Sequence, residues 1–421
     1  MTTTTPDPTA QQDLDDLAAR LNRVRRQKPS ATPLEGISAE RVAALIEVWR
    51  DLDYRAVEAE YAGLGSSLTA TADGRRLHYL HLRAEGDGLP IVLLHGWPDT
   101  PWQFRHLIPL LVAAGHDVVA PTAAGFGLSD EPSGELSPGL VAEDVHTLVT
   151  GLGYTSYAVH GTDWGAMVGA ALAAAHPDAV AALHLLQPPF DRAFFVDRGT
   201  ASEAERAYLT HLDQWGQSAA YVSAHTHQAD TLAAAFADSP AGLLAWIAEK
   251  YDAWSGANVR DEDIVRCVAT MWLTDSFRSS VRLYSEPAST WDTSSWDAES
   301  EGSADWGNED AATSGEWQTG DSPASGWEAG EWEPGAGESD AWGAGGDAGS
   351  GEWAPARIEV PTAFALFPQD IGTPPREFAE RFFDVQRYTV MPRGGHWAAL
   401  EEPQLVADDV IAFVSHVGGV R

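Results

Sequence analysis

The chain has 421 residues, of which 44% are hydrophobic, enough for a sizeable core and two or three domains. Its formal net charge of −36 argues against nucleic acid or an anionic membrane as a partner, because both require a basic face. Cys267 is the one cysteine, which excludes an intrachain disulfide framework and a multi-cysteine zinc site. No signal peptide and no apolar run of membrane-spanning length is visible, so we expect a soluble cytoplasmic protein.

Residues 287–356 differ in composition from the rest of the chain. They contain 16 Asp and Glu, 13 Gly and eight Trp, but no Lys, Arg, Leu, Ile, Val, Phe, Met or Tyr. A segment without aliphatic side chains cannot form a core, and its negative charges repel one another. We therefore interpret it as a disordered low-complexity loop on the surface, which does not disturb the fold. The alternative is a Trp-rich acidic interaction element or a gate over the pocket.

Residues 1–75 are predicted to form an N-terminal meander. Apolar side chains recur at helical spacing in two stretches, and Ser38 is suited to begin the second helix. The extended runs SLTATA and RLHYLHL flank Asp73–Gly74, which predicts a β-hairpin. The extension should therefore consist of helices followed by the first strands of a sheet.

Short apolar runs then alternate with Ala- and Leu-rich helical stretches. The runs lie at 91–96, 118–121, 157–161 and 182–186, and the pattern resumes at 360–367 and 386–391. This alternation predicts an α/β fold, with a mostly parallel sheet flanked by helices on both faces. Residues 189–286 lack strand patterns and predict a helical lid. The lid would separate a first core segment, 76–188, from a second, 357–421.

The segment His160-Gly-Thr-Asp-Trp-Gly-Ala follows one of these strands and opens an Ala-rich helix. Small residues on both sides of Asp163 permit the sharp strand-to-helix turn that holds a nucleophile at the sheet's edge. No G-x-S-x-G occurs in the chain, so a serine esterase has no candidate nucleophile. The alternative for Asp163 is ordinary capping of the following helix.

Two further motifs follow strands. In His95-Gly-Trp-Pro, the backbone N–H of Trp97 is predicted to face a developing oxyanion, together with that of Trp164. Late in the chain, Arg393-Gly-Gly-His-Trp places His396 on a Gly-rich loop, where we expect a general base. Asp370 lies just past a strand end and is the expected partner that orients the ring, with Asp384 as the nearest competitor.

The combination of GTDWGA, DSPAGLLAWIAEK and RGGHWAALEEP resembles the epoxide hydrolase family, in its microsomal-type branch with an N-terminal extension. The resemblance runs from about residue 13 to 413, except for the acidic insert. It implies an α/β-hydrolase fold with an inserted helical lid, and two lid tyrosines, Tyr221 and Tyr284. The chain departs from the family pattern in having Gly161-Thr162 and Asp99-Thr100, where Gly-Gly and Gly-Ser are usual.

The resemblance implies that Asp163 opens an epoxide to form an ester, which water activated by His396 and Asp370 then hydrolyses to a diol. A phenol suits the first step because it donates to the departing oxygen while staying protonated at neutral pH. We expect an epoxide and water as partners, and no metal or organic cofactor. The sequence leaves the oligomeric state open, a homodimer included. The alternatives are a haloalkane or haloacid dehalogenase with the same nucleophile, and a non-catalytic binding protein that acts through the insert.

Overall fold

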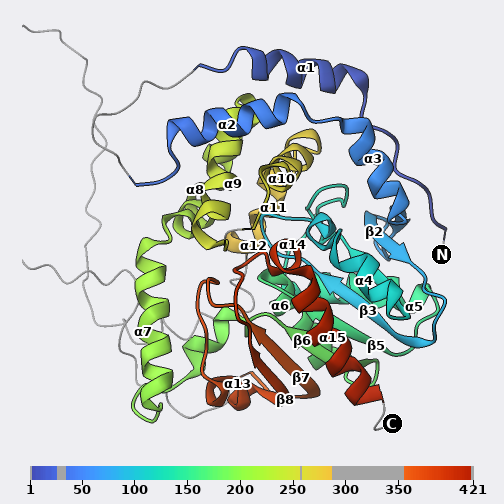
Figure 1. The fold of residues 1–421 in the computed structure, drawn as a ribbon, viewed down its shortest axis with the longest axis vertical. Helices are drawn as coiled ribbons and strands as arrows, with labels where there is room; N and C mark the ends of the chain where they lie inside the picture. The colour runs from blue at the N-terminus through green and yellow to red at the C-terminus, as the bar shows by residue number, and fades with distance from the viewer. Residues whose placement is uncertain (1, 26–34, 257, 287–354, 419–421) are drawn as a thin grey trace, which may run out of the picture. The chain divides into compact units, whose positions relative to one another are not determined.

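An eight-stranded sheet forms the centre of the computed structural model, which describes residues 2–25, 35–256, 258–286 and 355–418 (Figure 1). The strands lie in the order β1-β2-β4-β3-β5-β6-β7-β8. The pairs β1–β2 and β2–β4 are antiparallel and the remaining pairs are parallel, which confirms the predicted sheet. The strands are β1 (Ser67–Ala70), β2 (Arg76–Leu82), β3 (Gly88–Leu94), β4 (His116–Pro121), β5 (Tyr157–Gly161), β6 (Val180–Leu185), β7 (Ile358–Leu366) and β8 (Phe383–Val390).

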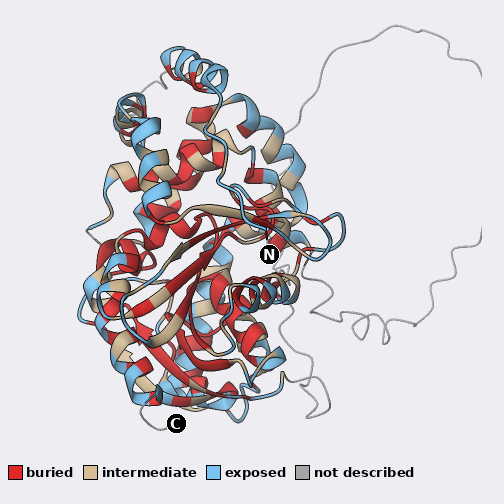
Figure 2. Cartoon of the chain, turned by 90° about the vertical axis from the view of Figure 1, so that its right-hand side faces the viewer, coloured by how far each residue is buried: buried red, intermediate tan, exposed pale blue. Residues whose placement is uncertain are grey.

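The central strands are apolar on both faces because helices cover both sides of the sheet. On β3, Val92 and Leu94 belong to one buried cluster, while Ile91 and Leu93 belong to another. Successive side chains of a strand point to opposite faces, so a continuous apolar run fills two cores. Figure 2 shows the consequence, with buried residues along the strands and exposed residues on the outer sides of the helices.

Among the described residues, helices on both faces of the sheet complete the core. The apolar sides of α4 and α15 fill one of the two clusters, and those of α5 and α6 fill the other. The elements are the 3₁₀ helix η1 (Pro101–Phe104), then α4 (Leu107–Ala113), α5 (Pro138–Gly151), α6 (Trp164–Ala175), α13 (Arg376–Phe382), α14 (Ala398–Glu401) and α15 (Pro403–Gly418).

The segment between β6 and the acidic insert is helical, as the sequence predicted. It comprises η2 (Phe190–Phe195), α7 (Glu203–Ser218), α8 (Ala220–Asp238), α9 (Pro240–Trp254), α10 (Asp261–Leu273), α11 (Phe277–Ser280) and α12 (Arg282–Ser285). Helix α7 begins with a reciprocal capping box between Ser202 and Glu205. Helix α8 is kinked at Gln228, whose backbone is not helical. These helices carry the two lid tyrosines, Tyr221 near the start of α8 and Tyr284 on α12.

The N-terminal residues form α1 (Gln11–Asn22), α2 (Ala39–Arg50) and α3 (Tyr54–Gly63), followed by β1. Ser38 caps α2 by accepting a hydrogen bond from the Arg41 N–H, as expected. Strands β1 and β2 form the predicted hairpin around Asp73–Gly74. Helices α1 and α2 pack against α9 of the lid, so the extension contacts the lid as well as the sheet (Figure 1).

Almost all of the acidic insert lies outside the described residues, so its predicted disorder and its alternative role as an interaction element stay predictions. In the part of the chain that the structure describes, no helix is both long enough and apolar enough to cross a membrane.

Candidate active site

Asp163 lies at the turn between β5 and α6 with a strained backbone, φ 52° and ψ −129°. Such a conformation is rare for a residue with a side chain, and it holds the carboxylate away from its own helix. Gly165 permits the turn, because a Cβ there would overlap the backbone of β3 at Leu94. The side chain of Asp163 does not cap α6. The capping alternative is therefore wrong.

Backbone N–H groups contact the Asp163 carboxylate. The Trp97 N–H donates to Oδ1 over 2.8 Å. The Trp164 N–H also hydrogen-bonds this carboxylate and lowers its pKa. Gly96 leaves the space that this arrangement needs, because a Cβ on Gly96 would overlap the carboxylate itself. The two N–H groups expected to form an oxyanion hole thus converge on one carboxyl group.

His396 lies between two carboxylates. Its Nδ1 is 2.7 Å from Oδ1 of Asp370, and its Nε2 is 3.6 Å from Oδ2 of Asp163. Asp370 thereby assigns the ring proton to Nδ1 and turns Nε2 toward Asp163. Asp384 instead accepts a hydrogen bond from Gln386 on β8. The structure therefore brings Asp163, Asp370 and His396 together.

The charges of this cluster shift the pKa of its members. Burial raises the pKa of Asp163, and the charge of His396 together with the two N–H groups opposes that rise. Burial by itself would lower the pKa of His396, but the charge and hydrogen bond of Asp370, with the charges of Asp163 and Glu401, raise it to about 8. At neutral pH the imidazole of His396 is therefore protonated in the resting enzyme.

The loop of His396 is fixed by contacts that the sequence did not reveal. The His396 N–H donates to the carbonyl of Trp254, at the end of α9, over 2.9 Å. Buried Glu401 accepts from the N–H of Gly256 at 2.6 Å and from that of Gly395 at 3.2 Å. Glu401 lies five residues after His396, but no spacing rule pointed to its role, because one of its partners, Gly256, comes from the lid.

Tyr221 and Tyr284 lie together beside the two tryptophans. Their ring centroids are 5.9 Å apart, and Tyr284 lies 5.2 Å from the ring of Trp164. Tyr221 stacks on Trp97 at 5.7 Å. Burial and the charge of Asp163 raise the pKa of Tyr221, while a hydrogen bond with Tyr284 lowers it. Burial also raises the pKa of Tyr284. Both phenols consequently stay protonated next to Asp163.

A histidine that the sequence analysis missed completes this aromatic group. His225 lies one helical turn after Tyr221 on α8 and is fully buried. Its ring centroid is 4.7 Å from Trp97, 4.9 Å from Tyr284 and 5.4 Å from Tyr221. The spacing of four residues from Tyr221 was the available signal, because such residues share one face of a helix.

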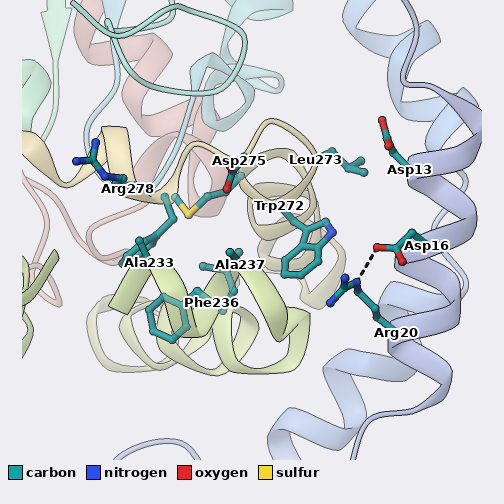
Figure 3. A pocket seen from close by; sticks show the side chains of 13 residues that line it. Asp13, Asp16, Arg20, Ala233, Phe236, Ala237, Trp272, Leu273, Asp275 and Arg278 are labelled. Carbon is teal, nitrogen blue, oxygen red and sulfur yellow. Dashed lines mark hydrogen bonds and ion pairs between the residues drawn. The ribbon is translucent and has the colours of Figure 1, made fainter. Parts of the chain in front are cut away.

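A hollow of about 320 Å³ lies elsewhere, between α1, α8 and the segment from α10 to α11. Figure 3 shows Asp16 and Arg20 of α1 paired on one side of it and facing Trp272. None of the expected catalytic residues lines this hollow. The Asp16–Arg20 ion pair is partly solvated, and among the described residues the hollow has no buried nucleophile with a base beside it, as the cluster at Asp163 has.

The fold and the cluster define a class: an α/β hydrolase that has a carboxylate at the position of the usual serine. The model of the α/β hydrolase fold matches residues 90–403, and that of the epoxide hydrolase N terminus matches residues 6–104. The chain therefore belongs to the α/β-hydrolase fold family, in the epoxide hydrolase branch that carries this N-terminal region.

Individual relatives agree with this assignment. The chain is 28% identical to juvenile hormone epoxide hydrolase of Bombyx mori, over 64% of this chain and 67% of the relative. It is 23% identical to epoxide hydrolase 1 of Sus scrofa, over 96% and 87%. Among solved structures, the epoxide hydrolase of Aspergillus niger is similar with a TM-score of 0.74 at 24% identity, covering 99% of this chain and 96% of that one. That structural likeness supports the fold.

Proposed function

We propose that the enzyme converts an epoxide to a vicinal diol through a covalent ester on Asp163. The observation that carries the proposal is the environment of this carboxylate. One oxygen accepts the Trp97 N–H, and the other lies 3.6 Å from His396 Nε2. Two protonated phenols lie on the lid side. A nucleophile, a base and donors for a leaving oxygen are thus present in one cluster.

In the first half-reaction, a carboxylate oxygen of Asp163 attacks an epoxide carbon from the side opposite the C–O bond. The C–O bond breaks, and the departing oxygen accepts hydrogen bonds from the phenols of Tyr221 and Tyr284. It then takes a proton from one of them, which leaves that tyrosine as a phenolate. The raised pKa values of these phenols keep both protons available at neutral pH. The product is a hydroxyalkyl ester of Asp163.

Before the second half-reaction, His396 gives up its proton, and the phenolate left by the first step regains one and becomes a phenol again. The neutral Nε2 of His396 then takes a proton from water as the water oxygen adds to the ester carbonyl carbon. The N–H groups of Trp97 and Trp164 stabilise the negative oxygen of the tetrahedral intermediate. The intermediate collapses, the alkoxide takes the proton from His396, and the diol leaves. Esterification also prepares the base: it removes the charge of Asp163, which helps to raise the pKa of His396 in the resting enzyme.

Single turnover in ¹⁸O-labelled water tests the ester. The first diol formed should contain unlabelled oxygen from Asp163, because labelled water enters the carboxylate and not the diol. The His396→Gln variant should accumulate an adduct one substrate heavier by intact mass, mapped to the peptide containing Asp163. The Asp163→Ala variant should form neither adduct nor diol. Label in the first diol would show direct attack by water and would reject the mechanism.

A dehalogenase releases a halide, which accepts hydrogen bonds but needs no proton. The departing oxygen of an epoxide does need one, and the phenols of Tyr221 and Tyr284, which can supply it, occupy the lid side of Asp163, where the Trp164 side chain hydrogen-bonds Tyr284. Phenols suit an oxygen leaving group. A halide-release assay with a short dihaloalkane should therefore give no turnover under conditions in which styrene oxide yields its diol.

A further inference from the structure

His225 presents a polar atom to the aromatic group without a protein partner. The residue has 0% of its surface exposed, and no described group hydrogen-bonds its Nδ1. A buried donor without a partner costs free energy, so proteins rarely keep one unless something else pairs with it. The ring of His225 contacts Trp97, Tyr221 and Tyr284, the side chains that face the proposed reaction, and also Trp246 and Phe277 of the lid.

The hydrogen bond on the other nitrogen fixes the tautomer. The indole N–H of Trp246 donates to His225 Nε2 over 3.0 Å, so Nε2 is the acceptor of the ring. Burial, together with the charge of Lys250, lowers the pKa of His225 to about 3, so the ring stays neutral. A neutral ring that accepts at Nε2 carries its proton on Nδ1. His225 therefore offers a fixed N–H donor rather than a titrating base.

A second unpartnered donor lies in the same group. The indole Nε1 of Trp97 is buried and has no described partner either. The rings of Trp97 and His225 meet edge to face at 4.7 Å. Two N–H donors thus lie beside the two phenols. A hydrocarbon epoxide has one acceptor, the oxirane oxygen, so it would leave these N–H donors without a partner.

We propose that His225 is a substrate-positioning residue, whose Nδ1–H donates to an oxygen on the carbon next to the oxirane ring, as in a glycidyl ether. This inference rests on the proposed function. The phenols of Tyr221 and Tyr284 take the oxirane oxygen, and a second oxygen on the adjacent carbon accepts from His225 Nδ1. The preferred substrates are consequently epoxides with an ether or carbonyl oxygen at that position.

A matched pair of substrates tests the inference. Phenyl glycidyl ether and 4-phenyl-1,2-epoxybutane differ by one ether oxygen in place of a methylene group. The measured quantity is the ratio of their kcat/KM values, which is independent of how much of a preparation is folded. In the His225→Phe and His225→Leu variants this ratio should fall about tenfold from the wild-type value, the size expected for one lost neutral hydrogen bond.

Two controls isolate the donor. His225→Asn keeps an N–H near the position of Nδ1 and should hold the ratio within about threefold of wild type. His81→Phe changes a histidine whose ring also meets a tyrosine, Tyr154, edge to face at 5.8 Å, and it should not alter the ratio. An unchanged ratio in active His225→Phe enzyme, or an equal loss on both substrates, would overturn the inference and leave the proposed function standing. Failure of the wild-type enzyme to open either epoxide would overturn both.

Discussion

Tyr251 on α9 donates a 2.6 Å hydrogen bond to Oδ2 of Asp99, two residues after Trp97. Both side chains of this bond are buried. The ring of Tyr251 also stacks on Trp397 with centroids 3.9 Å apart, directly beside His396. One lid helix thereby connects the loop that supplies an oxyanion donor to the loop that supplies the base.

Replacing Tyr251 with Phe should impair both stability and the second half-reaction. Burial raises the pKa of Asp99 to about 7, and the Tyr251 hydrogen bond opposes that rise, so the variant should raise it further. We expect a loss of about 1–3 kcal/mol in the free energy of unfolding, because a buried carboxyl group loses a donor. Decay of the ester should slow about tenfold as the Trp97 loop loosens. Urea denaturation and rapid-quench measurements check the two effects.

Tyr154→Phe is the matched control for this prediction. Tyr154 also donates a 2.6 Å hydrogen bond to an aspartate, Asp117, but both residues are only half-buried. Water can replace the lost donor there, so stability should change less and ester decay should not change. Equal effects of the two variants would show that Tyr251 has no special link to the reaction.

The pH dependence of ester decay should reveal the change in His396. The pKa of about 8 in the resting enzyme depends partly on the charge of Asp163, which the ester lacks. Because water activation needs the neutral ring, decay should slow as the pH falls, with an apparent pKa below 8. Single-turnover decay rates between pH 5 and pH 9 give this value. A flat profile from pH 5 to 8 would show that His396 is not the base.

The two phenols should act in the first half-reaction. Tyr221→Phe or Tyr284→Phe should each slow alkylation of Asp163 by something within the ~10²–10⁴-fold range of a positioned acid. The double variant should block alkylation, because no donor then meets the departing oxygen. The rate of adduct formation in a His396→Gln background measures this step alone. A double variant that alkylates at the parent rate would reject the lid assignment.

Asp409→Asn should lower the free energy of unfolding but leave the rates of both half-reactions unchanged. Buried Asp409 accepts hydrogen bonds from Arg387, His184 and Thr389. Burial would raise the pKa of Asp409, but these hydrogen bonds outweigh burial and lower it. The ionised carboxylate therefore stabilises the fold at neutral pH, and this stabilisation is lost on acidification. We expect a loss of about 2–3 kcal/mol, below the range for a fully buried pair because Arg387 is partly exposed.

Urea denaturation at pH 7 measures the Asp409 effect, and the neighbouring Asp408→Asn is its control. Asp408 is exposed and accepts a hydrogen bond from the side chain of Gln404 on the same helix. Its replacement should change the free energy of unfolding by less than about 0.5 kcal/mol. If Asp409→Asn were equally mild, the buried network around β8 would contribute little to folding.

The sequence alone determined the sheet, because apolar runs buried on both faces and helical periodicities are local patterns. It also indicated Asp163, since the small residues of the turn and the strained backbone at Asp163 occur within one short segment. The loops of Trp97 and His396 were identifiable for a similar reason: each follows a strand, and the carboxyl ends of parallel strands meet at one edge of the sheet.

Tertiary structure decided which side chains meet across the chain. Asp370 and Asp384 both lie at or after strands of the same sheet. Only the tertiary structure shows that Asp370 contacts His396, whereas Asp384 pairs with Gln386. The roles of His225, Glu401 and the Asp99–Tyr251 pair could not be predicted from the sequence, because each depends on a partner 21 to 152 residues away. Burial and neighbouring charges set the pKa of His396, and the hydrogen bond from Trp246 sets the tautomer of His225. Both exist only once the lid helices pack against the sheet.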